Sequence, residues 1–282
     1  MPTLPPDLQQ QVTTALTEDV GLGDVTAELV PPTQRVKGRV ITREPAVFCG
    51  GAWVTETFRQ LDPNVGVTWQ VSDGDRITPD QTLFEVAGLA RPILTGERTA
   101  LNFVQLLSAT ATAAHRYVEA VAGTGCAILD TRKTIPGLRT AQKYAVRCGG
   151  AQNHRAGLFD QVLIKENHVA AAGSLTAAIE AGRRAAGKRK VEVEVETLAE
   201  FEEALRAAPD IILLDEFSLE DMRRAVDINR AKGRPVKLEA SGSVTLETVR
   251  TVAETGVDYI SIGAITKHIR AVDLSMRLDF QP

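Results

Sequence analysis

Beyond Gly123 the chain alternates short apolar runs with amphipathic segments, and this alternation constrains the fold more than any other feature. Strand-like and helical units that alternate at this size predict parallel strands joined by right-handed crossovers. The helical segments are those in which apolar residues recur at helical spacing. The strand-like runs read CAILD, QVLIK, VEVEVE, IILLD, VKLEAS and YISIG, and the helical segments between them include LTAAIEAGRRAA, LAEFEEALRAA, LEDMRRAVDINRA and LETVRTVAETG.

Each of the six runs ends in a residue that is useful in binding or catalysis. In an α/β barrel the functional groups lie at the carboxyl ends of the strands, whereas an open doubly wound sheet binds ligands only near its switch point. Six consecutive functional ends therefore favour a barrel. The sequence has no G-x-G-x-x-G after the first strand and no P-loop, which counts against nucleotide-binding folds of those kinds. The ends are Asp130, Lys165, Glu194 or Glu196, Asp215, Glu239 with Ser241, and Gly263.

The region from Val36 to about Gly88 has a different rhythm. Its segments KGRVITRE, VTWQVSDGD and TLFEVAG are typical of strands, and residues 50–61 are expected to form a helix. These elements predict a small α+β sandwich. A long helix is expected to follow over residues 91–121, where apolar residues recur at helical spacing.

Positive charge is concentrated in one segment of an otherwise acidic chain. Residues 131–168 contain seven cations and two anions, a net +5, whereas the whole chain has a net charge of −4. Such a concentration predicts a site for a small, multiply anionic ligand, because nucleic acid normally requires a broader basic face. The cations are Arg132, Lys133, Arg139, Lys143, Arg147, Arg155 and Lys165.

Four of these cations follow or end strand-like runs, so their charges are expected to converge on one cavity. Guanidinium groups bind carboxylates and phosphates through paired hydrogen bonds, and lysine acts as a compact charge. Both kinds together suit a ligand that carries carboxylates and phosphates. The four are Arg132, Lys133, Arg155 and Lys165.

Other charged and imidazole side chains have a simpler interpretation. Lys143 and Arg147 are four residues apart and fit a solvated helix face. His154 lies beside Arg155 and is expected to contribute to the site, whereas His115 and His268 are expected to be structural.

Glu194 and Asp215 end consecutive strand-like runs, so their carboxylates are expected to meet at one mouth of the barrel. Paired carboxylates facing a pyrophosphate suit Mg²⁺, which completes its shell with phosphate oxygens and water. The run VEVEVE also places Glu192 and Glu196 on the same strand face as Glu194, and the sequence does not distinguish which glutamate reaches the site. The alternative is an exposed edge strand, because buried glutamates are costly without cations.

Small residues follow the last two strand-like runs. Residues 239–243 read EASGS and residues 261–264 read SIGA. Small side chains let backbone N–H groups approach a phosphate, and the phosphate sites of α/β barrels lie after their late strands. A phosphate cradle is therefore expected at these two loops.

The bulk properties describe an ordinary soluble protein of 282 residues, long enough for two domains or a barrel with an appendage. No apolar run is long enough to span a bilayer, and no secretory signal begins the sequence. The three cysteines form no C-x-x-C pair. Free or buried thiols in a reducing cytoplasm are expected, and neither a disulfide framework nor a zinc site.

Together these motifs resemble the quinolinate phosphoribosyltransferase family. The resemblance is carried by TRKTIPGLR, KYAV, NHR-x-G-L-x-D and LIKENH in the centre of the chain, and extends over nearly all of it in order. The further motifs are EDVGLGDVT, TGERTALNFVQLLS, VEVEVETL, IILLDEF, LEASGSVTLE and YISIGAIT. Two positions depart from the family pattern: Glu216 stands where asparagine is common, and Ser243 where glycine is frequent.

The resemblance implies a small N-terminal α/β sandwich domain, residues 1–106, joined by the C-terminal tail, residues 269–282. Residues 107–268 would form an incomplete parallel α/β barrel. It also implies a cytoplasmic homodimer with a shared active site, possible higher assembly, Mg²⁺ as cofactor, and neither nucleic-acid nor membrane partners. The implied substrates are quinolinate and phosphoribosyl pyrophosphate.

The resemblance also implies the role of each site residue. The carboxylates of quinolinate would be held by Arg132, His154, Arg155 and the partner's Arg98, with Thr131 and Lys133 alongside. Phosphoribosyl pyrophosphate and its Mg²⁺ would be held by Lys165, Glu194 and Asp215, with metal contact direct or through water. The phosphate would be cradled by Ser241, Gly242, Ser243, Ile262, Gly263 and Ala264. Lys133, Lys165, Glu194 and Asp215 would be catalytic.

Three functions are consistent with the sequence. The first is phosphoribosyl transfer to quinolinate with decarboxylation, giving nicotinate mononucleotide in NAD biosynthesis. The second is a related transfer to nicotinate or another pyridine monocarboxylate, without release of CO₂. The third is a phosphate-binding barrel without this catalysis, which rests on fold-level analogy.

Overall fold

The computed structural model describes residues 2–280, which fall into two compact units. The first contains the described parts of residues 1–115, 134–150 and 265–282, and the second contains residues 116–133 and 151–264. The predicted division between residues 106 and 107 falls inside a continuous helix and stays a prediction. Within residues 2–280, no helix is long and apolar enough to cross a membrane.

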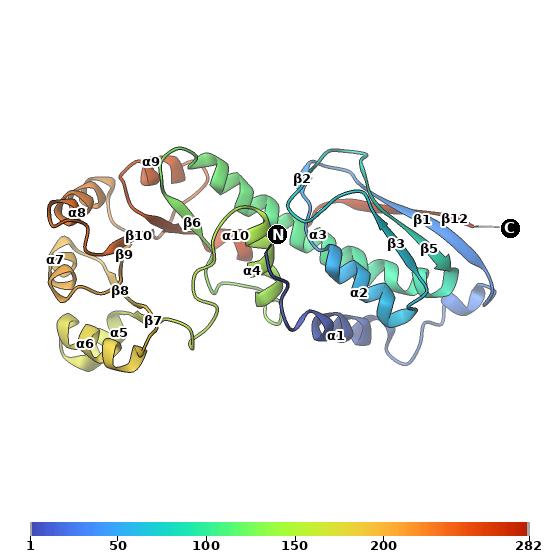
Figure 1. Cartoon of the computed structure of the whole chain (residues 1–282), viewed down its shortest axis with the longest axis horizontal. Coiled ribbons are helices and arrows are strands. Elements are labelled where there is room, and N and C mark those ends of the chain that lie inside the picture. The colour runs from blue at the N-terminus through green and yellow to red at the C-terminus, as the bar shows by residue number, and fades with distance from the viewer. Residues whose placement is uncertain (1, 281–282) are drawn as a thin grey trace. The chain divides into compact units, whose positions relative to one another are not determined.

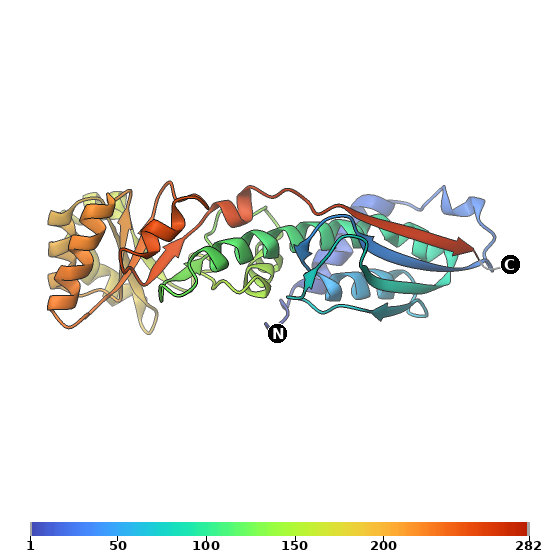
Figure 2. The same cartoon turned by 90° about the horizontal axis from the view of Figure 1, so that it is seen from above.

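A four-stranded antiparallel sheet forms the framework of the first unit, with strand order β12-β1-β5-β3 (Figure 1). Its strands are β1 (Arg35–Thr42), β3 (Gly66–Trp69), β5 (Thr82–Leu89) and β12 (Leu274–Phe280), and a separate two-stranded sheet joins β2 (Ala46–Val47) to β4 (Arg76–Ile77). Residues of β1 alternate between exposed and buried along its first half, because one face of the sheet covers the core. β12 lies beside β1 in Figure 2, pairing Val36 with Phe280 and Thr42 with Leu274, so the last described strand belongs to the sheet of the first unit.

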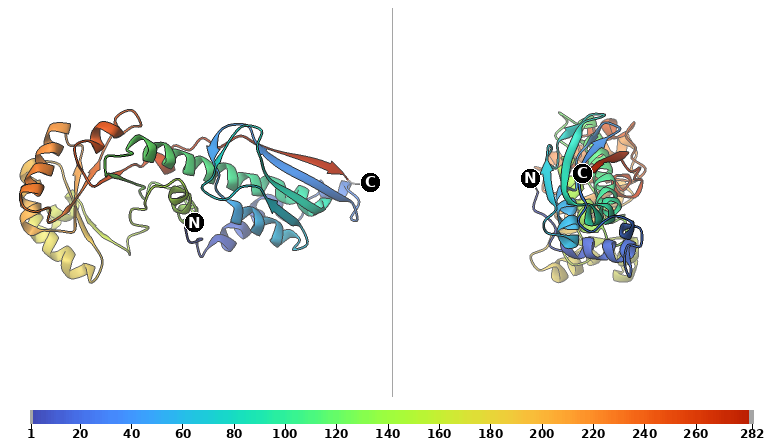
Figure 3. Two further views of the ribbon diagram at one scale, coloured as in Figure 1. Left: turned by 45° about the horizontal axis from the view of Figure 1, so that its top comes forward. Right: turned by 90° about the vertical axis from the view of Figure 1, so that its right-hand side faces the viewer.

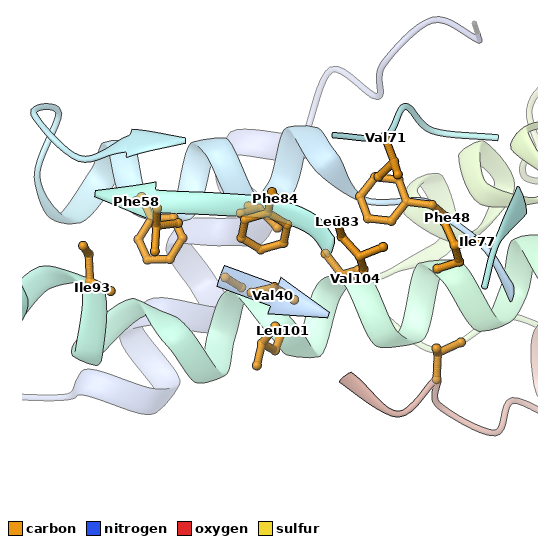
Figure 4. Close-up of a cluster of buried hydrophobic side chains, with 14 of the residues drawn as sticks. Val40, Phe48, Phe58, Val71, Ile77, Leu83, Phe84, Ile93, Leu101 and Val104 are labelled. Atoms are coloured by element: carbon orange, nitrogen blue, oxygen red, sulfur yellow. The ribbon is translucent and has the colours of Figure 1, made fainter. Parts of the chain in front are cut away.

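Helices pack against this sheet through a continuous apolar core (Figure 4). Phe84 of β5 and Phe58 of α2 are both fully buried in it. Gly96 of α3 allows α2 to approach closely, because a Cβ at this position would lie 2.7 Å from the Leu61 side chain. The helices of this unit include α1 (Leu8–Val20), η1 (Ala27–Leu29), α2 (Gly51–Leu61) and α4 (Arg139–Cys148), and α3 (Ala90–Ala120) extends from this unit into the second.

The second unit contains a six-stranded parallel sheet of order β6-β11-β10-β9-β8-β7. Within residues 2–280, β6 and β7 end this order without pairing with each other, so the barrel is incomplete, as expected. Helices α6, α7 and α8 lie along one face of the sheet (Figure 3). The strands are β6 (Ala127–Leu129), β7 (Val162–Ile164), β8 (Val191–Val195), β9 (Ile211–Asp215), β10 (Lys237–Ser241) and β11 (Tyr259–Ser261).

All six strand-like runs of the sequence form strands of this sheet. Four residues of β9 are buried because the strand is covered on both faces, which its Ile- and Leu-rich sequence permits. Side-chain caps fix where three of the intervening helices begin: Ser174, Thr197 and Ser218 each accept a backbone N–H of the first turn. The helices of this unit are α5 (Glu166–Ala172), α6 (Leu175–Ala186), α7 (Leu198–Ala207), α8 (Leu219–Ala231) and α9 (Val249–Ala253), and α10 (Ala264–Lys267) begins at its last residue and continues in the first unit.

Lys143 corrects one expectation. The sequence suggested a solvated helix face for Lys143 and Arg147, but only Arg147 is exposed, and Lys143 is buried. The reason is that residues 141–146 of α4 are all buried, so the helix is enclosed on most of its circumference. Gln142 illustrates this enclosure, since its buried amide donates 2.9 Å to the Thr266 carbonyl.

The core of the first unit yields a direct stability prediction. Replacing Phe84 by alanine removes a fully buried ring, and the free energy of unfolding is expected to fall by about 3–5 kcal/mol in chemical denaturation. Phe280 is the matched control, because its ring is 54% exposed on β12, and Phe280→Ala is expected to change stability by no more than ~0.5 kcal/mol. Equal losses in the two variants would contradict this position of the core.

Candidate active site

The carboxyl ends of β8, β9 and β10 bring three expected site residues to one edge of the sheet. Asp215 pairs in register with Ser241 on β10, and Glu194 pairs with Leu213 on β9. Parallel strands that are neighbours in the sheet end at the same edge. The strands that carry Glu194 and Asp215 are therefore neighbours, and the meeting of the two carboxylates stays a prediction. β8 lies between β7 and β9, so the alternative of an exposed edge strand for VEVEVE is wrong.

Lys165 forms an ion pair with Glu194 at this edge. The lysine follows β7, and its side chain is 43% exposed, whereas that of Glu194 is 11% exposed. The backbone N–H of Lys165 donates 2.9 Å to His168 Nδ1, which fixes the residue at the start of α5. Lys165 is thus held by its backbone while its ammonium stays accessible to a ligand.

Two fully buried glutamates lie inside the barrel around His154. His154 Nε2 lies 3.0 Å from Glu192 Oε2 and 3.5 Å from Glu239 Oε1. Glu192 comes from β8 and Glu239 from β10, with β9 between them, and alternate strands of a barrel contribute to one interior layer. Gln161 donates a further 2.5 Å hydrogen bond to Glu192 Oε2. Glu192 and Glu239 together form an acidic layer in the barrel interior.

The ring of His154 uses both nitrogens within the protein. Its Nδ1 accepts the backbone N–H of Arg155 at 2.7 Å, so Nε2 carries the proton that faces Glu192. Buried Asp130 fixes residues 153 and 154, because its carboxylate accepts the Asn153 side-chain amide at 2.7 Å and the His154 backbone N–H at 2.9 Å. The arrangement fixes the position of the Arg155 backbone.

The buried carboxyl of Glu239 is the protonated member of the acidic layer. Burial, followed by the nearby charge of Glu192, raises the pKa of Glu239 to about 8. Two ionised carboxylates in this interior would be costly, and one proton removes one of the two charges.

Arg132 and Arg155 lie close enough to affect each other electrostatically. Burial, followed by the charge of Arg132, lowers the pKa of Arg155, although Glu192, Asp160 and Glu194 oppose this effect. Asp160 also accepts the backbone N–H groups of residues 156 and 157 at 2.7 and 3.0 Å, which shapes the turn after Arg155. Two neighbouring guanidinium groups, one of them partly buried, suit an anionic ligand with more than one carboxylate.

Lys133 lies beside the loop that follows β11. A Cβ on Gly263 would lie 2.9 Å from Lys133 Cδ and 3.6 Å from Thr131 Oγ1, so the glycine lets the lysine stem pass. Thr131 Oγ1 accepts the Lys133 backbone N–H at 3.0 Å. Ile262 is buried, and its backbone N–H donates 2.9 Å to the Leu129 carbonyl. These contacts bring Thr131 and Lys133 close to Gly263, and their roles toward a ligand stay predictions.

The two departures from the family pattern contact each other. Ser243 Oγ donates 2.9 Å to Glu216 Oε1, and the Glu216 backbone N–H donates 3.1 Å to the Ser241 carbonyl. Glu216 has a φ of +51°, a left-handed conformation that asparagine adopts more readily than glutamate. Gly242 has a φ of +129°, and a Cβ there would lie 2.7 Å from the Glu216 carboxyl carbon. The serine therefore gives the extra carboxylate a partner beside the expected phosphate loop, next to a cavity of about 400 Å³.

The second unit thus contains every expected site residue except Arg98, which is exposed on α3 in the first unit. Sequence reasoning missed the contacts of Asp130 and Glu239, although both had been identified as strand ends. It named Glu192 as one of three candidates. Nothing in the sequence indicated Gln161, whose role depends on a hydrogen bond 31 residues along the chain.

The six-stranded parallel sheet that does not close defines an incomplete α/β barrel. Comparison with known proteins gives the family. Residues 24–108 match the quinolinate phosphoribosyl transferase N-terminal domain, and residues 110–277 match its C-terminal domain. The chain belongs to the quinolinate phosphoribosyltransferase family.

Individual relatives match over almost their whole length. The nicotinate-nucleotide pyrophosphorylase [carboxylating] of Mycobacterium leprae is 44% identical over 271 residues, covering 94% of each chain. The probable enzyme of the same name from Bacillus subtilis is 39% identical over 260 residues, covering 92% of this chain and 89% of that protein. The solved nicotinate-nucleotide pyrophosphorylase of Francisella tularensis has a TM-score of 0.94 and 46% identity, covering 98% of each chain.

The acidic layer predicts a distinctive dependence of stability on pH. Burial raises the pKa of Glu239 from 4.5 to about 8, so between these values the folded protein keeps a proton that the unfolded chain releases. This contribution to the free energy of unfolding falls as pH rises through that window. Glu239→Gln keeps the shape of the protonated acid and removes the equilibrium, so the stability of the variant relative to wild type is expected to rise between pH 4.5 and 8.

Denaturation at a series of pH values measures this difference. Glu220→Gln changes an exposed glutamate of α8 and is expected to leave the profile parallel to that of wild type. A Glu239→Gln profile parallel to wild type would show that Glu239 is ionised across the window.

Proposed function

We propose that this chain transfers the phosphoribosyl group of phosphoribosyl pyrophosphate to quinolinate with decarboxylation. The products are nicotinate mononucleotide, pyrophosphate and CO₂, so the enzyme is a pentosyltransferase of NAD biosynthesis. The observation that carries this proposal is that Arg155 lies near Arg132 and also near Glu194, which pairs with Lys165, because these groups provide for carboxylates and a diphosphate in one site. Names of relatives support it, including a tobacco quinolinate phosphoribosyltransferase [decarboxylating] that is 37% identical.

Quinolinate binds through its two carboxylates in this proposal. Arg132 and Arg155 hold them with paired hydrogen bonds, and Thr131 and Lys133 lie alongside. His154 belongs to the same pocket. Its ring nitrogens face the Arg155 backbone and Glu192, so His154 holds Arg155 in place and lines the quinolinate pocket.

Phosphoribosyl pyrophosphate binds along the site edge of the sheet. Lys165 and Lys133 face its phosphates, and the backbone N–H groups of residues 241–243 and 263–264 hold the 5′-phosphate. The Ile262 N–H is not among them, because it donates to the Leu129 carbonyl. Glu194 and Asp215 provide hard carboxylate oxygens that fit Mg²⁺, with the remaining ligands coming from phosphate and water. When bound, Mg²⁺ would neutralise charge on the leaving pyrophosphate.

The chain's residues mainly supply position and fixed charge. Departure of pyrophosphate leaves an oxocarbenium-like ribosyl centre, as in glycoside cleavage, and the carboxylates of Glu194 and Asp215 stabilise this cation. The pyridine nitrogen, aligned by the arginines, attacks that centre. The resulting positive ring nitrogen makes loss of the adjacent carboxylate favourable. No covalent intermediate with the protein is needed, so preorganisation accounts for most of the rate.

The proposed active form is a cytoplasmic homodimer. Arg98 is exposed on α3 in the first unit, so its guanidinium is accessible to another molecule. We assign Arg98 of the partner subunit to the quinolinate carboxylates, which gives the diacid a third guanidinium group. Each site then requires two chains.

A direct assay tests the reaction. Purified protein with quinolinate, phosphoribosyl pyrophosphate and Mg²⁺ is expected to release CO₂ and pyrophosphate in equal amounts. Lys165→Ala removes the ammonium that stabilises the leaving pyrophosphate and is expected to lower kcat about 10²–10³-fold. Lys188→Ala changes an exposed lysine and serves as the control. Folded protein that turns over nicotinate without releasing CO₂ would replace this function with the monocarboxylate reaction, and binding without any turnover would exclude both.

Mixed dimers test the shared site. Arg98→Ala and Lys165→Ala chains are each expected to be nearly inactive, because each homodimer lacks one residue at both sites. After subunit exchange, a mixed dimer regains one intact site, so up to half of the wild-type activity per mixed dimer is expected. The exchange itself is followed with differently tagged chains. Confirmed exchange without recovery would show that Arg98 does not act across the dimer.

A further inference from the structure

Two of the three cysteines meet in the first unit, and neither is among the residues assigned to the reaction. Three atoms lie within 4.8 Å of one another: Cys49 Sγ, Cys148 Sγ and a carboxylate oxygen of Asp73. Cys49 is fully buried and Cys148 is partly exposed. The cysteines are 99 positions apart, so their meeting is a product of the fold.

Helix α3 anchors the backbone on both sides of this contact. The Cys49 N–H donates 2.9 Å to Ser108 Oγ, which in turn donates 3.1 Å to the Cys49 carbonyl. Gly149, directly after Cys148, packs so closely that a Cβ would lie 2.3 Å from the Ala111 carbonyl oxygen. Ser108 and Ala111 are three residues apart on α3 and therefore share a face. This face holds the two cysteines opposite each other.

The third group of the cluster is already fully engaged. Asp73 Oδ1 accepts the backbone N–H groups of Gly50 and Gly51 at 3.0 and 3.1 Å, and Oδ2 accepts the Tyr144 hydroxyl at 2.7 Å. The carboxylate therefore caps the start of α2 and fixes Tyr144. These bonds favour chemistry between the two sulfurs over a three-ligand cation site.

The two sulfurs are chemically unequal. Burial, followed by a hydrogen bond to Cys148, raises the pKa of Cys49 well above its usual value, and that hydrogen bond is the main cause that lowers the pKa of Cys148. The partly exposed Cys148 is thus the better thiolate. Cys126, in the second unit, provides a comparison, since burial raises its pKa to about 12.

We propose that Cys49 and Cys148 are a peroxide-reactive thiol pair that forms a reversible disulfide bond. The Cys148 thiolate attacks one oxygen of a hydroperoxide, the O–O bond breaks, and the products are a sulfenic acid and an alcohol or water. The Cys49 sulfur then attacks the Cys148 sulfur, and the S–O bond breaks with loss of water. Two thiols are oxidised and one peroxide is reduced. The sulfurs must approach by at most about 3 Å to reach bonding distance.

Peptide mapping of the full-length protein tests the pair. Reduced protein is freed of reductant and metal, treated with hydrogen peroxide, blocked with N-ethylmaleimide and digested without reduction. A peptide containing Cys49 linked to one containing Cys148 is expected, free thiols are expected to fall from three to one, and dithiothreitol is expected to restore all three. Cys126→Ser is the matched control, which is expected to form the same link.

Trapping the intermediate tests the order of the steps. With Cys49→Ser, dimedone is expected to label Cys148 strongly, because its sulfenic acid has no thiol to react with. With Cys148→Ser, labelling of Cys49 is expected to be at least about tenfold weaker. Three unmodified thiols in peroxide-treated wild type, or a link that includes Cys126, would overturn the pair. Both of these outcomes are measured on the wild-type protein, so they do not require any cysteine variant to fold.

Discussion

The contact between His154 and the acidic layer of Glu192 and Glu239 is the constraint on which the site depends. Charged groups are rarely buried in a barrel interior, because their desolvation is costly without partners. Here the cost is reduced by several means at once. Glu239 holds a proton, Gln161 and His154 donate to Glu192, and Arg155 lies near enough for its charge to be felt. Removing any one of these groups leaves the others incompletely compensated, so the layer acts as a unit.

This layer connects the interior of the barrel to the ligand site through the backbone. Glu192 fixes the His154 ring, the ring accepts the Arg155 N–H, and Asp130 holds the same turn from its other side. Consequently the guanidinium of Arg155 starts from a defined position near Arg132, although both side chains are long and flexible. Binding a rigid diacid then requires less ordering of the protein, which is the physical meaning of preorganisation here.

Much of this arrangement follows from local sequence patterns. Periodicity predicts the six strands, and strand ends predict the neighbourhood of Glu194, Asp215 and Ser241, because parallel neighbours end together. Contacts between distant parts of the chain do not follow from local patterns. Glu192 and Glu239 meet across β9, and Cys49 and Cys148 meet because both segments pack against α3. Lys143 is a similar case: its helical spacing predicts exposure, but the segments around α4 bury it. The family resemblance supplied the residue roles, which spacing alone left open.

A crystal structure with quinolinate, a non-reactive analogue of phosphoribosyl pyrophosphate and Mn²⁺ would show whether the His154 contact positions Arg155 for the ligand. We expect the quinolinate carboxylates on Arg132 and Arg155, an anomalous Mn²⁺ peak beside Glu194 and Asp215, and an unmoved His154 ring between Glu192 and the Arg155 backbone. Quinolinate bound away from the two arginines, or a His154 ring turned from Glu192 to donate to the ligand, would contradict this expectation.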